Sequence, residues 1–258
     1  MLQKTKYQTL ILTGALAPVS SHAAMLRITV EAPSNLGLAP ALLSFHDGSN
    51  DFFDTGSAAS AGLEELAEVG STGTLQGSLT SGDNITIANG GPFFPGSSNT
   101  VTFNVSDTNT MLSFAAMLLP SNDWFIGNNN AIDVSSVLLG GFGSTLTLDF
   151  ARVYDAGTEA EDFAFSPGNG IIGIDTMASP PGGTVTSDPI SLVSASDPFG
   201  SFANISPGSF DSTIYDFNAA GVGNTVLGRV TLTNIPEPGT TLLSALGVMG
   251  IALRRRRS

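Results

Sequence analysis

The stretch Leu26-Arg27-Ile28-Thr29-Val30-Glu31 alternates apolar and polar residues along its whole length. A period of two residues indicates a strand with one face against a core and the other toward solvent. Seven further apolar or alternating runs follow, separated by segments rich in Gly, Pro, Asn, Asp and Ser. Together the eight runs predict an all-β fold, an antiparallel β-sandwich of about eight strands. The seven later runs are Ala41–His46, Asn84–Ala88, Thr100–Val105, Met111–Leu118, Thr145–Arg152, Ile190–Val193 and Thr225–Thr233.

One segment between these runs has a helical pattern instead. Leu63, Leu66 and Ala67 recur at the spacing of one helix face. Ser60 precedes them as a candidate N-cap, and Gly70 follows as a candidate C-terminal stop. The sequence therefore predicts one short helix inserted into the β domain.

The first residues have the order of parts found in a secretory signal peptide. Lys4 and Lys6 precede the apolar run Thr9–Ala17, and the small residues Ser21-His22-Ala23-Ala24 follow. We therefore predict a signal helix over residues 1–24, with cleavage after Ala23 or Ala24. The chain is expected to be exported.

The last residues combine a short triplet, an apolar segment and an arginine cluster. The apolar segment, residues 239–253, would reach about 22 Å as a helix, which makes a short transmembrane helix. In this order the three parts resemble the PEP-CTERM sorting signal of Gram-negative bacteria. The resemblance implies an exosortase-type processing enzyme as a partner and transient anchoring in the inner membrane through 239–253; an anchor that stays in place is the alternative. The triplet is Pro236, Glu237 and Pro238, and the cluster is Arg254, Arg255, Arg256 and Arg257.

Residues 25–235 are then left as one domain, followed by the segment 236–258. This domain carries 21 acidic residues but only Arg27, Arg152 and Arg229 as basic ones. Such a negative surface repels phosphate backbones, so we expect no nucleic-acid partner and look for cation binding instead. The absence of cysteine from the sequence excludes disulfides and thiolate chemistry.

Hydrolytic chemistry has little support in these residues. Once a signal peptide is removed, His46 is the sole histidine, and the sequence has no G-x-S-x-G nucleophile motif. A glycosidase with paired carboxylates remains an open alternative, because the acids are many. The domain has a single Trp, however, and such enzymes commonly display aromatic platforms for sugars.

The acids gather in segments that follow predicted strands. Calcium takes six to eight oxygen ligands from carboxylates, carbonyls and water, and loops at one edge of a sandwich can bring such oxygens together. Solvated loop acids are the alternative interpretation. The acids concerned are Asp47, Asp51 and Asp54, then Asp123, then Asp155, Glu159, Glu161 and Asp162.

Seven blocks of the sequence are Leu43–Gly48, Phe52–Gly56, Ala58–Glu68, Ser113–Met117, Pro120–Gly127, Tyr154–Glu159 and Gly228–Leu232. In this order they resemble the spondin N domain of F-spondin and its bacterial relatives. The resemblance implies an antiparallel sandwich similar to calcium-dependent lipid-binding domains, with a bound calcium ion. Carried over by position, the ligands are Asp123, Asp155 and Glu159, of which Glu159 stands where the family has Asp. The segment Ser187–Phe217 is longer than the family pattern and is interpreted as an insertion.

These observations lead to one expected function with two alternatives. We expect an exported, non-enzymatic, calcium-binding module at the cell envelope or outside the cell. It would act in adhesion or in association with extracellular matrix, exopolysaccharide or a cell-surface partner. The alternatives are a secreted carbohydrate-active hydrolase and a calcium-dependent lipid-binding sandwich. Trp124 is expected to pack in the core behind the calcium loop, and Arg152 and Arg229 to neutralise inward-facing acids.

Overall fold

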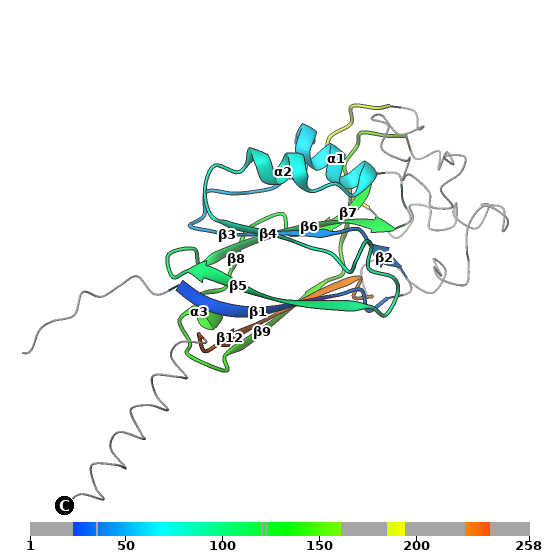
Figure 1. The fold of residues 1–258 in the computed structure, drawn as a ribbon. Helices are drawn as coiled ribbons and strands as arrows, with labels where there is room; N and C mark the ends of the chain where they lie inside the picture. The colour runs from blue at the N-terminus through cyan, green and yellow to red at the C-terminus, as the bar shows by residue number, and fades with distance from the viewer. Residues whose placement is uncertain are drawn as a thin grey trace, which may run out of the picture.

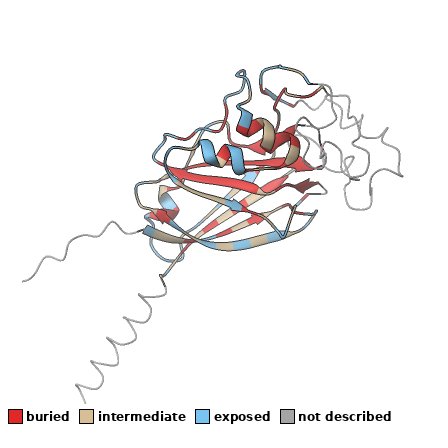
Figure 2. Cartoon of the chain, turned by 45° about the horizontal axis from the view of Figure 1, so that its top comes forward, coloured by how far each residue is buried: buried red, intermediate tan, exposed pale blue. Residues whose placement is uncertain are grey.

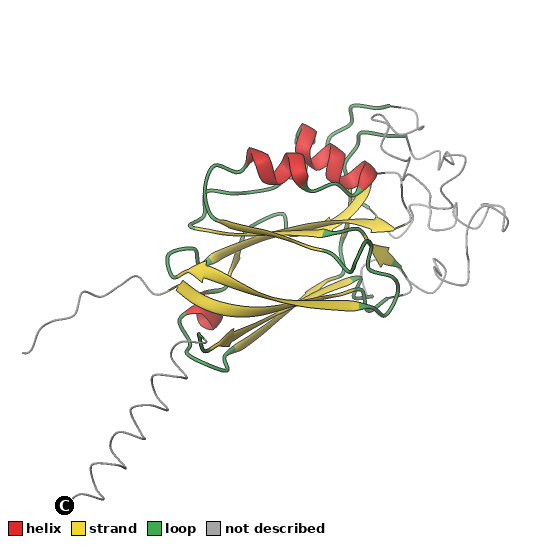
Figure 3. Cartoon of the chain, in the orientation of Figure 1, coloured by secondary structure: helices red, strands yellow, loops and turns green. Residues whose placement is uncertain are grey.

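The computed structural model describes residues 23–34, 36–119, 121, 123–160, 185–193 and 225–237. Within them two antiparallel sheets pack face to face, with short helices outside (Figures 1 and 3). The all-β class and the antiparallel sandwich are confirmed. The predicted transmembrane helix and residues 1–22 of the predicted signal helix lie outside the described residues. No helix in the described ranges is both long enough and apolar enough to cross a membrane.

The smaller sheet is built around the stretch that opens the sequence analysis. Leu26, Ile28 and Val30 are fully buried, whereas Arg27 on the other face is exposed. This first strand pairs antiparallel with a neighbour on each side, from Ala23 opposite Ser106 to Glu31 opposite Arg229. The sheet order is β5 (Ser98–Ser106), β1 (Ala23–Glu31), β12 (Gly228–Ile235) and β9 (Thr145–Phe150).

The larger sheet has eight strands, all of whose pairings are antiparallel. Its two longest strands, β3 and β6, are buried almost throughout (Figure 2). The main path runs β11 (Ser191–Leu192), β10 (Val153–Asp155), β7 (Trp124–Gly127), β6 (Met111–Leu119), β3 (Ala41–His46) and β4 (Asp83–Ile87); β2 (Gly37–Leu38) and β8 (Ile132–Asp133) pair with β6 beside that path.

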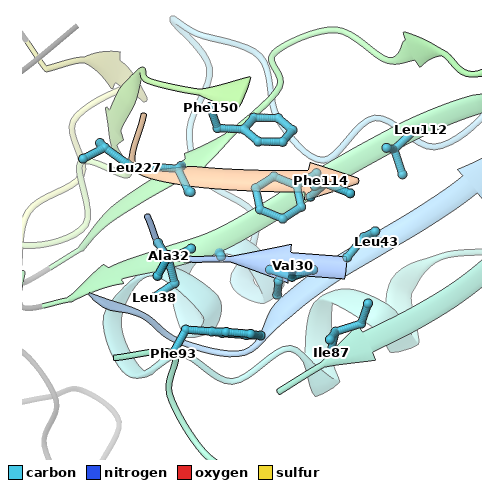
Figure 4. Close-up of a cluster of buried hydrophobic side chains, with 14 of the residues drawn as sticks. Val30, Ala32, Leu38, Leu43, Ile87, Phe93, Leu112, Phe114, Phe150 and Leu227 are labelled. Atoms are coloured by element: carbon cyan, nitrogen blue, oxygen red, sulfur yellow. The ribbon is translucent and has the colours of Figure 1, made fainter. Parts of the chain in front are cut away.

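The main core lies between the two sheets. Phe114 of β6 stacks on Phe150 of β9 with ring centroids 4.2 Å apart, so one aromatic pair joins the sheets. Val30 and Leu43 lie in the same cluster (Figure 4). Trp124 also belongs to this core and is 1% exposed, so the expectation of a packed tryptophan is confirmed.

A third layer covers the outer face of the larger sheet. Helices α1 (Ala61–Val69) and α2 (Gly73–Ser78) lie there (Figure 1), and a second core of Leu63, Leu66, Phe125 and other residues fills the space beneath them. A strand covered on both faces has no solvent side, which is why β3 and β6 read as continuous apolar runs.

The predicted helix forms where its end signals place it. The Ser60 side chain accepts a hydrogen bond from the Leu63 N–H, and Gly70 closes the helix with φ of 69°. The prediction of a single helix is wrong, because α2 and the one-turn α3 (Ser135–Leu138) also form. Neither has a side-chain N-cap bond, so neither carries the signal by which α1 was found. The estimate of about eight strands is low, since the described residues contain twelve.

His46 ends β3 as a buried structural residue. Its Nδ1 accepts the backbone N–H groups of Gly48 (3.0 Å) and Asn50 (3.3 Å). A backbone N–H can only donate, so the proton of the neutral ring sits on Nε2, which faces Ser113 Oγ at 3.1 Å. Burial lowers the pKa of His46, and protonation of Nδ1 would break the turn that the two backbone bonds hold.

This arrangement predicts a pH-dependent difference between wild type and His46→Asn, whose amide oxygen can replace Nδ1 as acceptor. A histidine pKa that is lower in the folded state makes the unfolded state bind more protons below about pH 6.5. We expect the stability advantage of wild type to be largest above pH 7 and to shrink as pH falls through 6. Thermal melts of both proteins from pH 5 to 8 measure it; parallel curves would contradict this role of His46.

Candidate metal centre

Asp123 lies at full burial just before β7 and fixes the loop that follows β10. Its Oδ2 accepts the backbone N–H of Thr158 (2.8 Å) and of Glu159 (3.0 Å), and the Thr158 hydroxyl at 3.3 Å. Its carbonyl oxygen accepts the Ala156 N–H at 3.1 Å. Its Oδ1 is buried and accepts no hydrogen bond from any described group. Residues 33 to 36 positions apart in sequence thus meet at Asp123, whose carboxylate has one oxygen that no described group donates to.

Asp155, the last residue of β10, pairs with Trp124 across the strands and brings its carboxyl to that of Asp123. Burial, followed by the charge of Asp123, raises the pKa of Asp155 to about 6. Burial also raises the pKa of Asp123. Two carboxylates in contact repel each other unless a proton or a cation lies between them.

Glu68 of α1 is a third acid of this cluster, and the sequence analysis did not name it as a site residue. It is buried, its carboxyl interacts with the Thr158 side chain, and burial raises its pKa. Its charge also raises the pKa of Asp123. The sequence signal for Glu68 was its place directly after Leu66 and Ala67, which lie on the helix face predicted to be buried.

Glu159 enters the site first through its backbone, which donates to Asp123. The residue is buried and bridges Val185. No group of three or more His, Asp or Glu side chains within the described ranges has the spacing to hold a metal. The structure therefore brings the carboxyls of Asp123 and Asp155 together, and the Glu159 side chain as a third ligand stays a prediction.

No arginine of the described chain neutralises this cluster. Arg229 forms its ion pair with Asp149 on the outer face of the smaller sheet, with Nε and Oδ1 2.6 Å apart. Arg152 and Arg27 are exposed. The expectation that Arg152 and Arg229 neutralise inward-facing acids is wrong, because both lie at the surface.

The segment 185–193 lies over the acid loop. Thr186 donates its N–H to the Thr158 carbonyl at 2.8 Å, and the Asp188 N–H reaches the Gly157 carbonyl at 2.9 Å. Ser191 then pairs with Asp155 as part of β11. Residues 191 and 192 of the segment Ser187–Phe217 thus pair with the larger sheet, and its interpretation as an insertion stays a prediction. Residues 194–217 lie outside the described ranges.

The donor set fits a hard divalent cation. Calcium prefers carboxylate oxygens and completes its shell with carbonyls and water. The unused Asp123 Oδ1, the adjoining Asp155 carboxyl and the exposed positions of the arginines all favour a cation there. Three other predicted calcium acids lie apart: Asp47 is exposed and binds the Ser49 N–H, and Asp51 is exposed beside Asp54. Glu161 and Asp162 lie outside the described residues.

Of the sorting-signal residues, Pro236 and Glu237 follow β12 directly and are described. Pro238 and the four arginines Arg254, Arg255, Arg256 and Arg257 lie outside the described residues.

Gly157 connects the acid loop to the overlying segment. Its φ is +72°, and a Cβ there would collide with the Asp188 carbonyl oxygen. Gly90 has the same φ of +72° in open space. Both Gly→Ala variants incur the left-handed strain of about 1–2 kcal/mol, and Gly157→Ala must also displace the segment 185–193. We expect it to lose about 1–2 kcal/mol more unfolding free energy than Gly90→Ala in urea denaturation. Equal losses would mean that the overlying segment adds no stability.

Two family models match the chain. The Spondin_N family model matches residues 36–178, more than half of the chain. That range contains Glu68, Asp123, Asp155 and Glu159. The PEP-CTERM protein-sorting motif matches residues 234–257, which marks the chain for export and for an exosortase-type sorting system at the cell envelope. A search of curated proteins finds no match. The chain belongs to the Spondin_N family and carries a PEP-CTERM sorting motif.

Proposed function

We propose that this chain is an exported, non-enzymatic module whose acid loop is ordered by a calcium ion. It acts in adhesion or in association with extracellular matrix, exopolysaccharide or another cell-surface partner. The observation that carries the proposal is the buried Asp123 carboxylate, whose Oδ1 accepts no hydrogen bond from the described part of the chain while Asp155 lies against it.

Neutralisation is the physical reason for a cation. Burying a charge without compensation is costly, and two charges in contact are costlier. Near neutral pH the Asp155 carboxyl, whose pKa is about 6, is mostly ionised beside Asp123. A divalent cation bound by Asp123 and Asp155 then supplies the positive charge, and the Glu159 side chain is the third proposed ligand. Extracellular sites of this kind fill at Kd values of about 10⁻⁴–10⁻³ M.

A binding role is also supported by how the acids and the histidine are held. Asp123 is 0% exposed, so a substrate could not reach it without opening the loop at 158–159. The His46 imidazole is fully buried, and its Nδ1 accepts two backbone N–H groups, so it has no proton to donate to a carboxylate. These constraints suit a rigid binding scaffold better than an acid–base site.

The C-terminal segment 236–258 determines where the exported module is located. We infer that residues 239–253 anchor the exported chain in the inner membrane with the arginine cluster on the cytoplasmic side. The exosortase-type enzyme then removes this tail and leaves the module at the envelope or outside the cell.

Calcium should raise the melting temperature of wild type by several degrees at pH 7.5, relative to the same protein in chelator. A ligand at 100 times its Kd stabilises the folded state by about 2.7 kcal/mol. Asp123→Asn should lose this response while remaining folded, because its amide oxygen can accept the Thr158 and Glu159 N–H groups and its amide nitrogen can donate to Asp155. Calorimetric melts in calcium and in chelator, with metal analysis of the purified protein, measure this.

Asp47→Asn is the matched control, because it also removes one acid but lies at the surface away from the cluster. It should keep the full calcium response. A wild-type transition that is identical in calcium and in chelator, together with no calcium in the purified protein, would refute the proposal.

A further inference from the structure

Both ends of the described chain meet at one groove at the end of the smaller sheet. Ala23 at the start of β1 and Glu237 after β12 line it, together with Leu139 and Phe142 from the connection between α3 and β9. The groove encloses about 310 Å³. Figure 1 shows α3 beside the start of β1 and the end of β12. The groove therefore lies where the domain joins the sorting tail.

The most exposed large apolar side chains of the described ranges lie here. Leu139 is 65% exposed and Phe142 is 68% exposed. Gly141 and Gly143, with φ of 83° and 89°, turn the chain around them in open space. Large exposed apolar side chains grouped together indicate a contact with another apolar phase.

The loop that carries these side chains is fixed to the base of the tail. The Asn234 side chain donates to the carbonyls of Val137 (3.0 Å) and Leu138 (3.1 Å) at the end of α3. Its backbone donates to the Ser144 carbonyl and accepts from the Gly143 N–H. Leu139 and Phe142 consequently keep their position relative to the last residues of β12.

The length of the connection limits what can lie against this surface. Glu237 lines the groove, and Gly239 opens the apolar segment only two residues later, which spans at most about 7 Å. With the segment 239–253 in a bilayer, Leu139 and Phe142 must lie at the level of the lipid headgroups. The segment itself, as a helix about 22 Å long and about 10 Å wide, is far larger than the groove.

We propose that the groove end of the domain, through Leu139 and Phe142, inserts into the outer surface of the bilayer that carries the tail. This inference rests on the proposed membrane anchoring of residues 239–253. The rim of the groove carries the acids Asp107 and Glu237, and the domain is strongly negative, so the contact is with zwitterionic headgroups rather than anionic ones. Apolar side chains at the interface are held by burial of their own surface. The contact holds the Pro236–Pro238 triplet close to the membrane.

The test uses the chain from Met25 to Ser258, without the predicted signal helix, with Phe142→Trp, mixed with vesicles of phosphatidylcholine and phosphatidylethanolamine. Trp124 is the sole native tryptophan and is buried, so it gives a constant background. Flotation reports anchoring. We expect the new tryptophan to emit at shorter wavelength on the vesicles, to be quenched by brominated lipid, and to become severalfold less accessible to acrylamide.

The matched control is Phe94→Trp, also at an exposed phenylalanine (47%), at the opposite end of the smaller sheet. Its loop bonds to Ala32, just beyond the other end of β1, about 30 Å from Ala23. We expect no lipid quenching there.

Three results would overturn the inference. A chain that floats with Phe142→Trp unquenched by lipid leaves the anchor intact but refutes the contact. A chain that does not float refutes the anchoring and the contact together. Protection of Phe142→Trp from acrylamide before vesicles are added would mean that the tail or a second copy covers the groove.

Discussion

The loop after β10 and the segment 185–193 both depend on the burial of the Asp123 carboxylate. Its Oδ2 holds the loop of Thr158 and Glu159, and its carbonyl holds Ala156. That loop in turn bonds the segment 185–193, which supplies β11. A carboxylate with these donors stays in place only if its charge is compensated, so the local fold and the affinity for a proton or cation are two results of one interaction.

Local sequence patterns predicted most of the fold. All eight predicted strands exist, and α1 lies between the predicted Ser60 and Gly70, because alternation and capping act over a few neighbouring residues. The missed strand β7, Trp124–Gly127, is four buried residues without alternation, since both of its faces are covered. The missed strand β10 is three residues long and is defined by its pairing with β7 and with β11, which lie far from it along the chain. Such pairing has no local signature.

The candidate site was also predicted in part from the sequence. Resemblance supplied Asp123 and Asp155, and the fold brings their carboxyls together. The position of a residue in the family pattern did not predict which contacts its side chain makes. The backbone N–H of Glu159 donates to Asp123 at the site. Glu68 enters the cluster from α1, a helix that the sequence analysis considered only for its apolar face. Glu68 joins the acid cluster only when α1 packs on the larger sheet, because the residues that it contacts there are distant in sequence.

The acid cluster and the groove occupy opposite ends of the molecule. β6 begins at Met111, which pairs with Asp133 two residues before α3, and ends at Leu119, shortly before Asp123. Its nine residues separate the two sites by about 30 Å. That is about three Debye lengths near physiological salt, so charges at one end have little effect at the other. With the groove on the bilayer, the acid cluster lies at the end of the domain away from the membrane. The same orientation persists for as long as the tail is attached, because Asn234 ties the groove loop to the strand from which the tail begins.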